Sequence, residues 1–125
     1  MTPRLYVVQD DLFFAERVRT TARRLGLEPV MLSPAETGDR TWEAGDVVVI
    51  QVTLHPDRQL SLIENLRRSA PSLRVVAVTG HLETDLRAQA KALGATLAAH
   101  SSVERVLARA CGLRERDADA ASAPD

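Results

Sequence analysis

The sequence predicts a single α/β domain, in which helices cover both faces of a parallel β-sheet. Short, continuous apolar runs alternate with longer segments whose apolar residues recur at helical spacing. The runs are rich in β-branched residues, which is typical of strands buried on both faces. Repeated strand–helix order indicates a parallel sheet with helical crossovers, and a length of 125 residues fits one domain.

The composition is that of an ordinary globular protein. Apolar residues make up 45% and charged residues 26%, and the formal net charge of −1 predicts no general attraction to nucleic acid or membrane. The lone cysteine, Cys111, allows no intramolecular disulfide, and we expect a buried thiol. No secretory leader and no apolar run of about 20 residues is visible, so we expect a cytoplasmic protein.

The first strand–helix unit is clear. Leu5 to Val8 is a short apolar run, and Asp10 or Asp11 can cap the segment that follows it. That segment, 12–25, has four apolar residues at helical spacing and predicts an amphipathic helix that Gly26 ends. The four residues are Phe14, Val18, Ala22 and Leu25.

The next segments are weaker. Residues 27–32 are a second strand candidate. Residues 33–46 contain Pro34, Gly38 and Gly45 and only one large apolar side chain, Trp42, which predicts mostly loop with one helical turn.

The central unit carries the clearest strand, the β-branched run 47–52. Pro56 and Asp57 then open a helix whose inner face holds Leu62, Ile63 and Leu66. Pro71 lies beyond the end of this helix.

The last two units complete the domain. Residues 73–79 predict a fourth strand, and residues 82–93 a helix that Gly94 closes; its inner face holds Leu82, Leu86, Ala90 and Leu93. Residues 95–99 predict a short fifth strand. Ser101 and Glu104 have capping-box spacing before a final helix, whose inward residues are Val103, Val106, Leu107 and Ala110. We predict a domain over 1–112 and a disordered polar tail over 113–125.

The carboxyl ends of the predicted strands gather the polar residues. In an open α/β sheet, function collects at this edge. The segments that reach it are 9–11, 52–55, 79–81 and 100–102.

Three segments of the chain resemble the receiver domain of bacterial response regulators. Val7–Asp11 resembles the first strand with its acidic pair, Val48–Pro56 the third strand with its loop, and Val75–Gly80 followed by Ala92–Ala95 the fourth strand to the start of the fifth. The resemblance covers about residues 4–111. It implies a flavodoxin-like five-stranded parallel sheet of order 2-1-3-4-5, with the second helix short or missing.

The resemblance also implies a degenerate phosphorylation pocket. Receivers hold a magnesium ion with two acidic residues and an acceptor aspartate, and bind the phosphoryl group with a hydroxyl and a lysine. The matching positions here are Gln9, Asp10, Val52, Thr79 and Ser101. Val52 has no nucleophilic atom, so phosphorylation of the family type is chemically impossible there. We expect metal binding to be weak or absent and no cofactor.

We therefore predict a stand-alone pseudo-receiver in bacterial two-component signalling. It would act as a dimer or adaptor through contacts with a signalling protein, without catalysis, phosphorylation, direct nucleic-acid binding or membrane contact. In the family, the fourth helix, fifth strand and fifth helix form the usual partner surface. Here the resemblance assigns Lys91, Ala98, His100, Arg105 and Arg109 to it.

Other readings of the same edge remain open. The alternative function is a small-ligand-binding domain that uses the vacated pocket near Asp10, Val52, Thr79 and Ser101. Asp10 and Asp11 could form a catalytic carboxylate pair, although a helix cap explains one of them more simply. Three histidines near this edge could bind a metal, although their spacing matches no helix-borne ligand motif; they are His55, His81 and His100.

Overall fold

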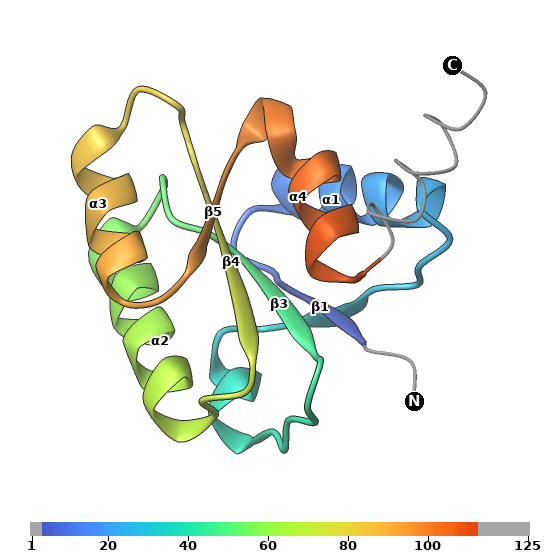
Figure 1. The fold of residues 1–125 in the computed structure, drawn as a ribbon, viewed down its shortest axis with the longest axis horizontal. Helices are drawn as coiled ribbons and strands as arrows, with labels where there is room; N and C mark the ends of the chain where they lie inside the picture. The colour runs from blue at the N-terminus through green and yellow to red at the C-terminus, as the bar shows by residue number, and fades with distance from the viewer. Residues whose placement is uncertain (1–3, 113–125) are drawn as a thin grey trace.

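Five parallel strands form one sheet in the order β2-β1-β3-β4-β5 (Figure 1). The computed structural model describes residues 4–112, so the predicted tail over 113–125 lies outside the described residues. The strands are β1 (Leu5–Val8), β2 (Val30–Leu32), β3 (Val47–Gln51), β4 (Arg74–Thr79) and β5 (Thr96–Ala99). The predicted fold class and strand order are confirmed.

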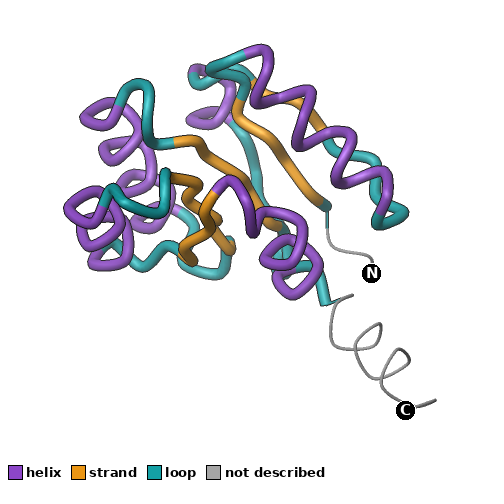
Figure 2. Tube along the Cα trace, turned by 90° about the horizontal axis from the view of Figure 1, so that it is seen from above, coloured by secondary structure: helices purple, strands orange, loops and turns teal. Residues whose placement is uncertain are grey.

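Helices cover both faces of the sheet. They are α1 (Leu12–Arg24), α2 (Pro56–Ser69), α3 (Thr84–Ala92) and α4 (Val103–Ala110). Figure 1 shows α1 and α4 on one side of the strands and α2 and α3 on the other, and Figure 2 shows the strands lying between helices from above. This layering follows from helical crossovers between parallel strands.

Strand β3 lies at the centre of the core. All five of its residues are buried, as the continuous β-branched run predicts. Val48 and Ile50 face α2 and α3, together with Val52 just beyond the strand. Val47 and Val49 face α1 and α4. Two apolar layers therefore meet at this strand, which positions its carboxyl end rigidly.

The segment between β2 and β3 contains no α-helix, in agreement with the prediction that the second helix is short or missing. It holds a single 3-10 turn, Ala35–Asp39. Trp42 packs edge-on against Tyr6 with ring centroids 4.9 Å apart, and the Arg40 guanidinium lies 4.6 Å from the centre of the same tyrosine ring. These side chains cover the part of the sheet that a helix would otherwise protect.

Several predicted boundaries were wrong. Strand β2 begins at Val30 rather than at residue 27, and β5 begins at Thr96. The capping box of Ser101 and Glu104 does not form, because a 3-10 turn (His100–Ser102) precedes α4. The backbone N–H of Ala99 instead donates to the Ser102 hydroxyl at 3.0 Å.

Two predictions from composition can be compared with the structure. Cys111 is only half-buried, and this partial burial raises the pKa of its thiol. Within residues 4–112, no helix is long and apolar enough to cross a bilayer.

Candidate functional site

The carboxyl edge of the sheet holds a cluster of charged side chains centred on Asp10. The Asp10 side chain is 4% exposed. One of its carboxylate oxygens lies 2.9 Å from Nδ1 of His55, and the other accepts a hydrogen bond from the guanidinium of Arg58. The same guanidinium nitrogen lies 3.1 Å from His55 Nδ1. This group is called the Asp10 cluster below.

The start of α2 places both partners of Asp10. His55 is the residue that precedes the helix, and Arg58 lies in its first turn after Pro56. Strands β1 and β3 are neighbours in the sheet, so the segments that follow them meet at one edge. A buried carboxylate is costly without a partner, and the Arg58 guanidinium neutralises this one.

The Asp10 cluster does not fit a magnesium site of the receiver type. Such a site needs several oxygen ligands. Here the acceptor position holds the alkyl side chain of Val52, and Gln9 is exposed. Asp10 supplies the remaining carboxylate, and a guanidinium already occupies it. No group of three or more metal-ligating side chains occurs in the part of the chain that the structure describes.

Thr79, which the resemblance matches to the receiver hydroxyl, also forms a hydrogen bond within the protein. Thr79 is fully buried at the end of β4. Its hydroxyl oxygen accepts a hydrogen bond of 3.1 Å from the guanidinium of Arg87 on α3. The guanidinium of Arg87 therefore contacts the acceptor side of the Thr79 hydroxyl.

Glu83 links two loops at this edge. A single carboxylate oxygen accepts hydrogen bonds of 2.6 Å from the Thr53 hydroxyl and from the backbone N–H of Gly80. These two bonds, the Thr53 hydroxyl bond first, hold the pKa of Glu83 below its ordinary value. The loop after β3 is thereby tied to the loop after β4.

The five positions inferred from the resemblance differ in burial. Val52 and Thr79 are fully buried and the Asp10 side chain nearly so. Gln9 and Ser101 are both exposed. The charged residues that do complete the edge, Arg58, Glu83 and Arg87, were missed. No sequence motif marks these three residues, so only their positions shortly after strand ends could have indicated that they lie at this edge.

The predicted interface residues are partly displaced. Lys91, Arg105 and Arg109 are exposed on α3 and α4. Ala98 is 1% exposed and belongs to the core, because its side chain turns from β5 towards α4. It therefore offers no surface to a partner, and this assignment was wrong.

The three histidines are not brought together. His55 belongs to the Asp10 cluster, and His81 is exposed in the loop after β4. His100 lies edge-on to Phe14, with ring centroids 6.1 Å apart. The second acidic residue, Asp11, caps α1 by accepting a hydrogen bond from the Phe13 backbone at 3.1 Å, which supports the cap rather than a catalytic pair.

Four large apolar side chains within residues 4–112 are exposed after the carboxyl ends of strands. Each lies at the start of a helix or in a loop that follows a strand. They are Leu12 (71% exposed), Phe13 (86%), Leu54 (52%) and Leu82 (80%). Leu82 was predicted to lie on the inner face of a helix, but that helix begins at Thr84.

The fold is shared with solved receiver domains. A response regulator from Thermotoga maritima is 21% identical, with a TM-score of 0.71; the match covers 92% of this chain and 99% of that chain. The receiver domain of NtrX from Brucella abortus is 20% identical, with a TM-score of 0.71, covering 86% and 98%. A putative pilus assembly-related protein from Burkholderia pseudomallei is 18% identical, with a TM-score of 0.73, covering 90% and 91%.

The sequence itself is divergent. No protein-family model and no curated protein matches this chain. The likeness therefore lies in the fold.

Proposed function

We propose that this chain is a receiver-fold protein of bacterial signal transduction that acts through protein contacts and is not phosphorylated. One observation carries the proposal: the Arg58 guanidinium binds Asp10 where a receiver would hold its cation, beside an alkyl side chain at Val52. Phosphoryl transfer needs a nucleophile and a metal that neutralises charge. Neither is supplied by this arrangement of side chains.

The engaged hydrogen bonds at the edge support a fixed state. In the proposed function, Arg58 takes the place of a cation at Asp10, while the bonds of Arg87 to Thr79 and of Glu83 to Gly80 hold the neighbouring groups of the edge in place. The edge would then keep one conformation without an input from phosphorylation. No catalytic step is assigned to it.

The partner surface is proposed on α3, β5 and α4, where a dimer or adaptor contact would form. Strand β5 is an edge strand, so one side of it has no neighbouring strand in the sheet. A cavity of about 200 Å³ lies between β5 and α4. Exposed cationic side chains come from two of these elements, Lys91 from α3 and Arg105 and Arg109 from α4, and they favour a partner with acidic groups.

The small-ligand alternative receives no support from the edge. A ligand there would have to displace the contact between Arg58 and Asp10, and it would find Val52 and Thr79 already buried. The protein-contact proposal requires no such displacement.

Intact mass after incubation with acetyl phosphate and Mg²⁺ tests the proposal. We expect the mass of this chain to stay unchanged while a phosphorylatable receiver in the same reaction gains one phosphoryl group. Addition of a phosphoryl group to this chain would overturn the proposal. Light scattering after size exclusion then compares the full chain with Arg105→Glu, because a dimer through the α3–β5–α4 face should weaken in that variant.

A further inference from the structure

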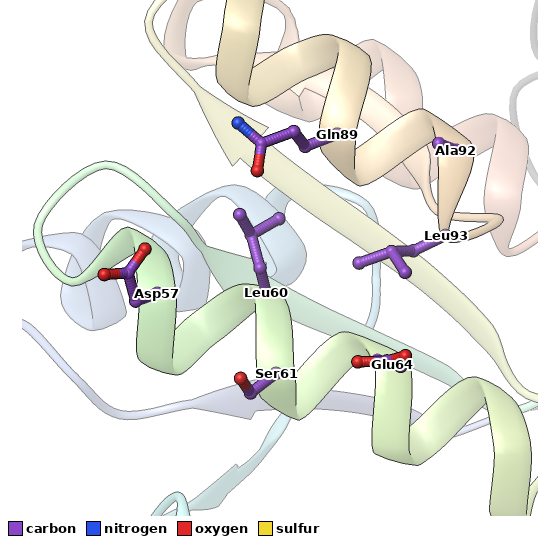
Figure 3. A pocket seen from close by; sticks show the side chains of 7 residues that line it. All are labelled: Asp57, Leu60, Ser61, Glu64, Gln89, Ala92 and Leu93. Carbon is purple, nitrogen blue, oxygen red and sulfur yellow. The ribbon is translucent and has the colours of Figure 1, made fainter.

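A second surface lies away from the carboxyl edge, in a groove of about 520 Å³ between α2 and α3. Figure 3 shows Leu60 pointing from α2 towards α3, with Gln89 and Leu93 on the opposite wall. The groove has an apolar floor and polar walls. It is lined by Asp57, Leu60, Ser61, Glu64, Gln89, Ala92 and Leu93.

The α2 wall of this groove is acidic. Asp57 and Glu64 are seven residues apart on one helix, which places them roughly 10 Å apart along its axis. Within residues 4–112, no cationic side chain lies within ion-pair distance of Asp57. Glu64 has only a long contact of 3.9 Å with Arg68, and an exposed pair of this kind contributes little.

Three other arginines of these helices bond to groups outside the groove lining. Arg58 bonds the buried carboxylate at the end of β1. Arg67 donates to the backbone carbonyl of Leu73 at 2.7 Å, and Arg87 donates to the hydroxyl at the end of β4. Asp57 therefore has no ion pair within residues 4–112, and Glu64 has only the long contact with Arg68, so both carboxylates can accept a cationic group of a partner.

We propose that the α2–α3 groove binds a basic amphipathic helix of a partner protein. Apolar side chains of that helix would cover Leu60 and Leu93, and lysine or arginine residues about two turns apart would face Asp57 and Glu64. The groove is open and extends along two helices (Figure 3), a shape that suits a helix better than a compact small molecule. The inference deepens the proposed protein-contact function and rests on it.

A synthetic helical peptide serves as the probe. It carries leucines three and four residues apart on one face and two arginines seven residues apart beside them. Titration of the full-length ¹⁵N-labelled protein should shift the amide resonances of α2 and α3 around the groove. A peptide with glutamates in place of the two arginines should bind at least roughly tenfold more weakly, because like charges would meet at the acidic wall.

Two matched variants make the test specific. Glu64→Arg reverses a charge inside the groove, whereas Glu16→Arg reverses a comparable charge on the exposed face of α1. Each glutamate lies near one arginine of its own helix, at 3.9 Å and 3.4 Å. Glu64→Arg should lower the affinity about tenfold, and Glu16→Arg should leave it unchanged.

Three results would overturn the groove assignment. They are no binding of the arginine peptide, equal binding by Glu64→Arg, and shifts confined to other elements. Groove shifts that follow protein concentration alone would assign the surface to a second copy instead. The phosphorylation test concerns the Asp10 cluster and is independent of the groove. Failure of peptide binding would therefore not change the phosphorylation result, and failure of the proposed function would appear as a gain in mass.

Discussion

The contact between Asp10 and Arg58 should contribute measurably to folding stability. Asp10 is almost fully buried, while the Arg58 side chain is 51% exposed. Hydrogen bonds to charged groups contribute about 1.5–3 kcal/mol. Because half of the guanidinium side chain meets solvent, screening lowers this, and we expect a coupling energy of about 1–2 kcal/mol.

A double-mutant cycle isolates this energy. The variants are Asp10→Asn, Arg58→Met and the pair together, each unfolded in urea. Arg58→Met should be the more harmful single change, because it leaves the carboxylate with His55 alone. Asp10→Asn releases a guanidinium that can turn to water. For a domain of this size, 1 kcal/mol corresponds to a melting-temperature shift of roughly 4 °C.

The cycle also has a clear negative outcome. If the effects of the two single changes simply add, with a coupling below about 0.5 kcal/mol, the contact is not a stabilising ion pair. Arg58 would then not replace a cation at Asp10. Arg17 is an exposed arginine of α1 that forms no ion pair within residues 4–112. Arg17→Met is the matched control and should change stability by less than about 0.5 kcal/mol.

Three further perturbations test other parts of the structure. The folded-state pKa of Glu83 lies below its ordinary value of 4.5, so ionised Glu83 stabilises the fold above that pH, and this stabilisation is lost as the pH falls through the folded pKa. The free energy of unfolding, measured as a function of pH, should show this loss in the wild type and not in Glu83→Gln. In urea unfolding, Gly94→Ala and Gly26→Ala should each lose about 1–2 kcal/mol, because both glycines have positive φ. Gly94→Ala should lose more, because only there would the new Cβ lie 2.9 Å from Arg67 Nε; equal losses would contradict this. Trp42→Ala should cost about 2 kcal/mol in the same assay, because it uncovers the tyrosine ring of β1, and a loss under about 0.5 kcal/mol would mean that the loop does not protect the sheet.

The local pattern of the chain was sufficient to predict most of the elements. The helical spacing of Phe14, Val18 and Ala22 predicts the buried face of α1, and all three are buried. The β-branched run before Val52 predicts the buried central strand. These features could be read directly because helix and strand periodicity arises from neighbours in the sequence.

The boundaries next to turns were less predictable. Ser101 and Glu104 have the spacing of a cap, but the chain forms a 3-10 turn there, and Glu104 instead pairs with Arg24 at 2.9 Å. That partner is 80 residues away in the sequence. The local capping pattern was therefore overridden by a tertiary contact, which sequence spacing cannot predict.

The sequence alone determined two things about this protein: the alternation of strands and helices, and the absence of a nucleophile at Val52. The chemistry of a side chain and the spacing of apolar residues along the chain can both be read without coordinates, because each depends only on the residue or on its neighbours in the sequence. Only the tertiary structure decided that Arg58 meets Asp10 across 48 residues, and that Glu83 joins two loops. Parallel strands bring distant loops to one edge, and the reach of each side chain then selects which charges pair.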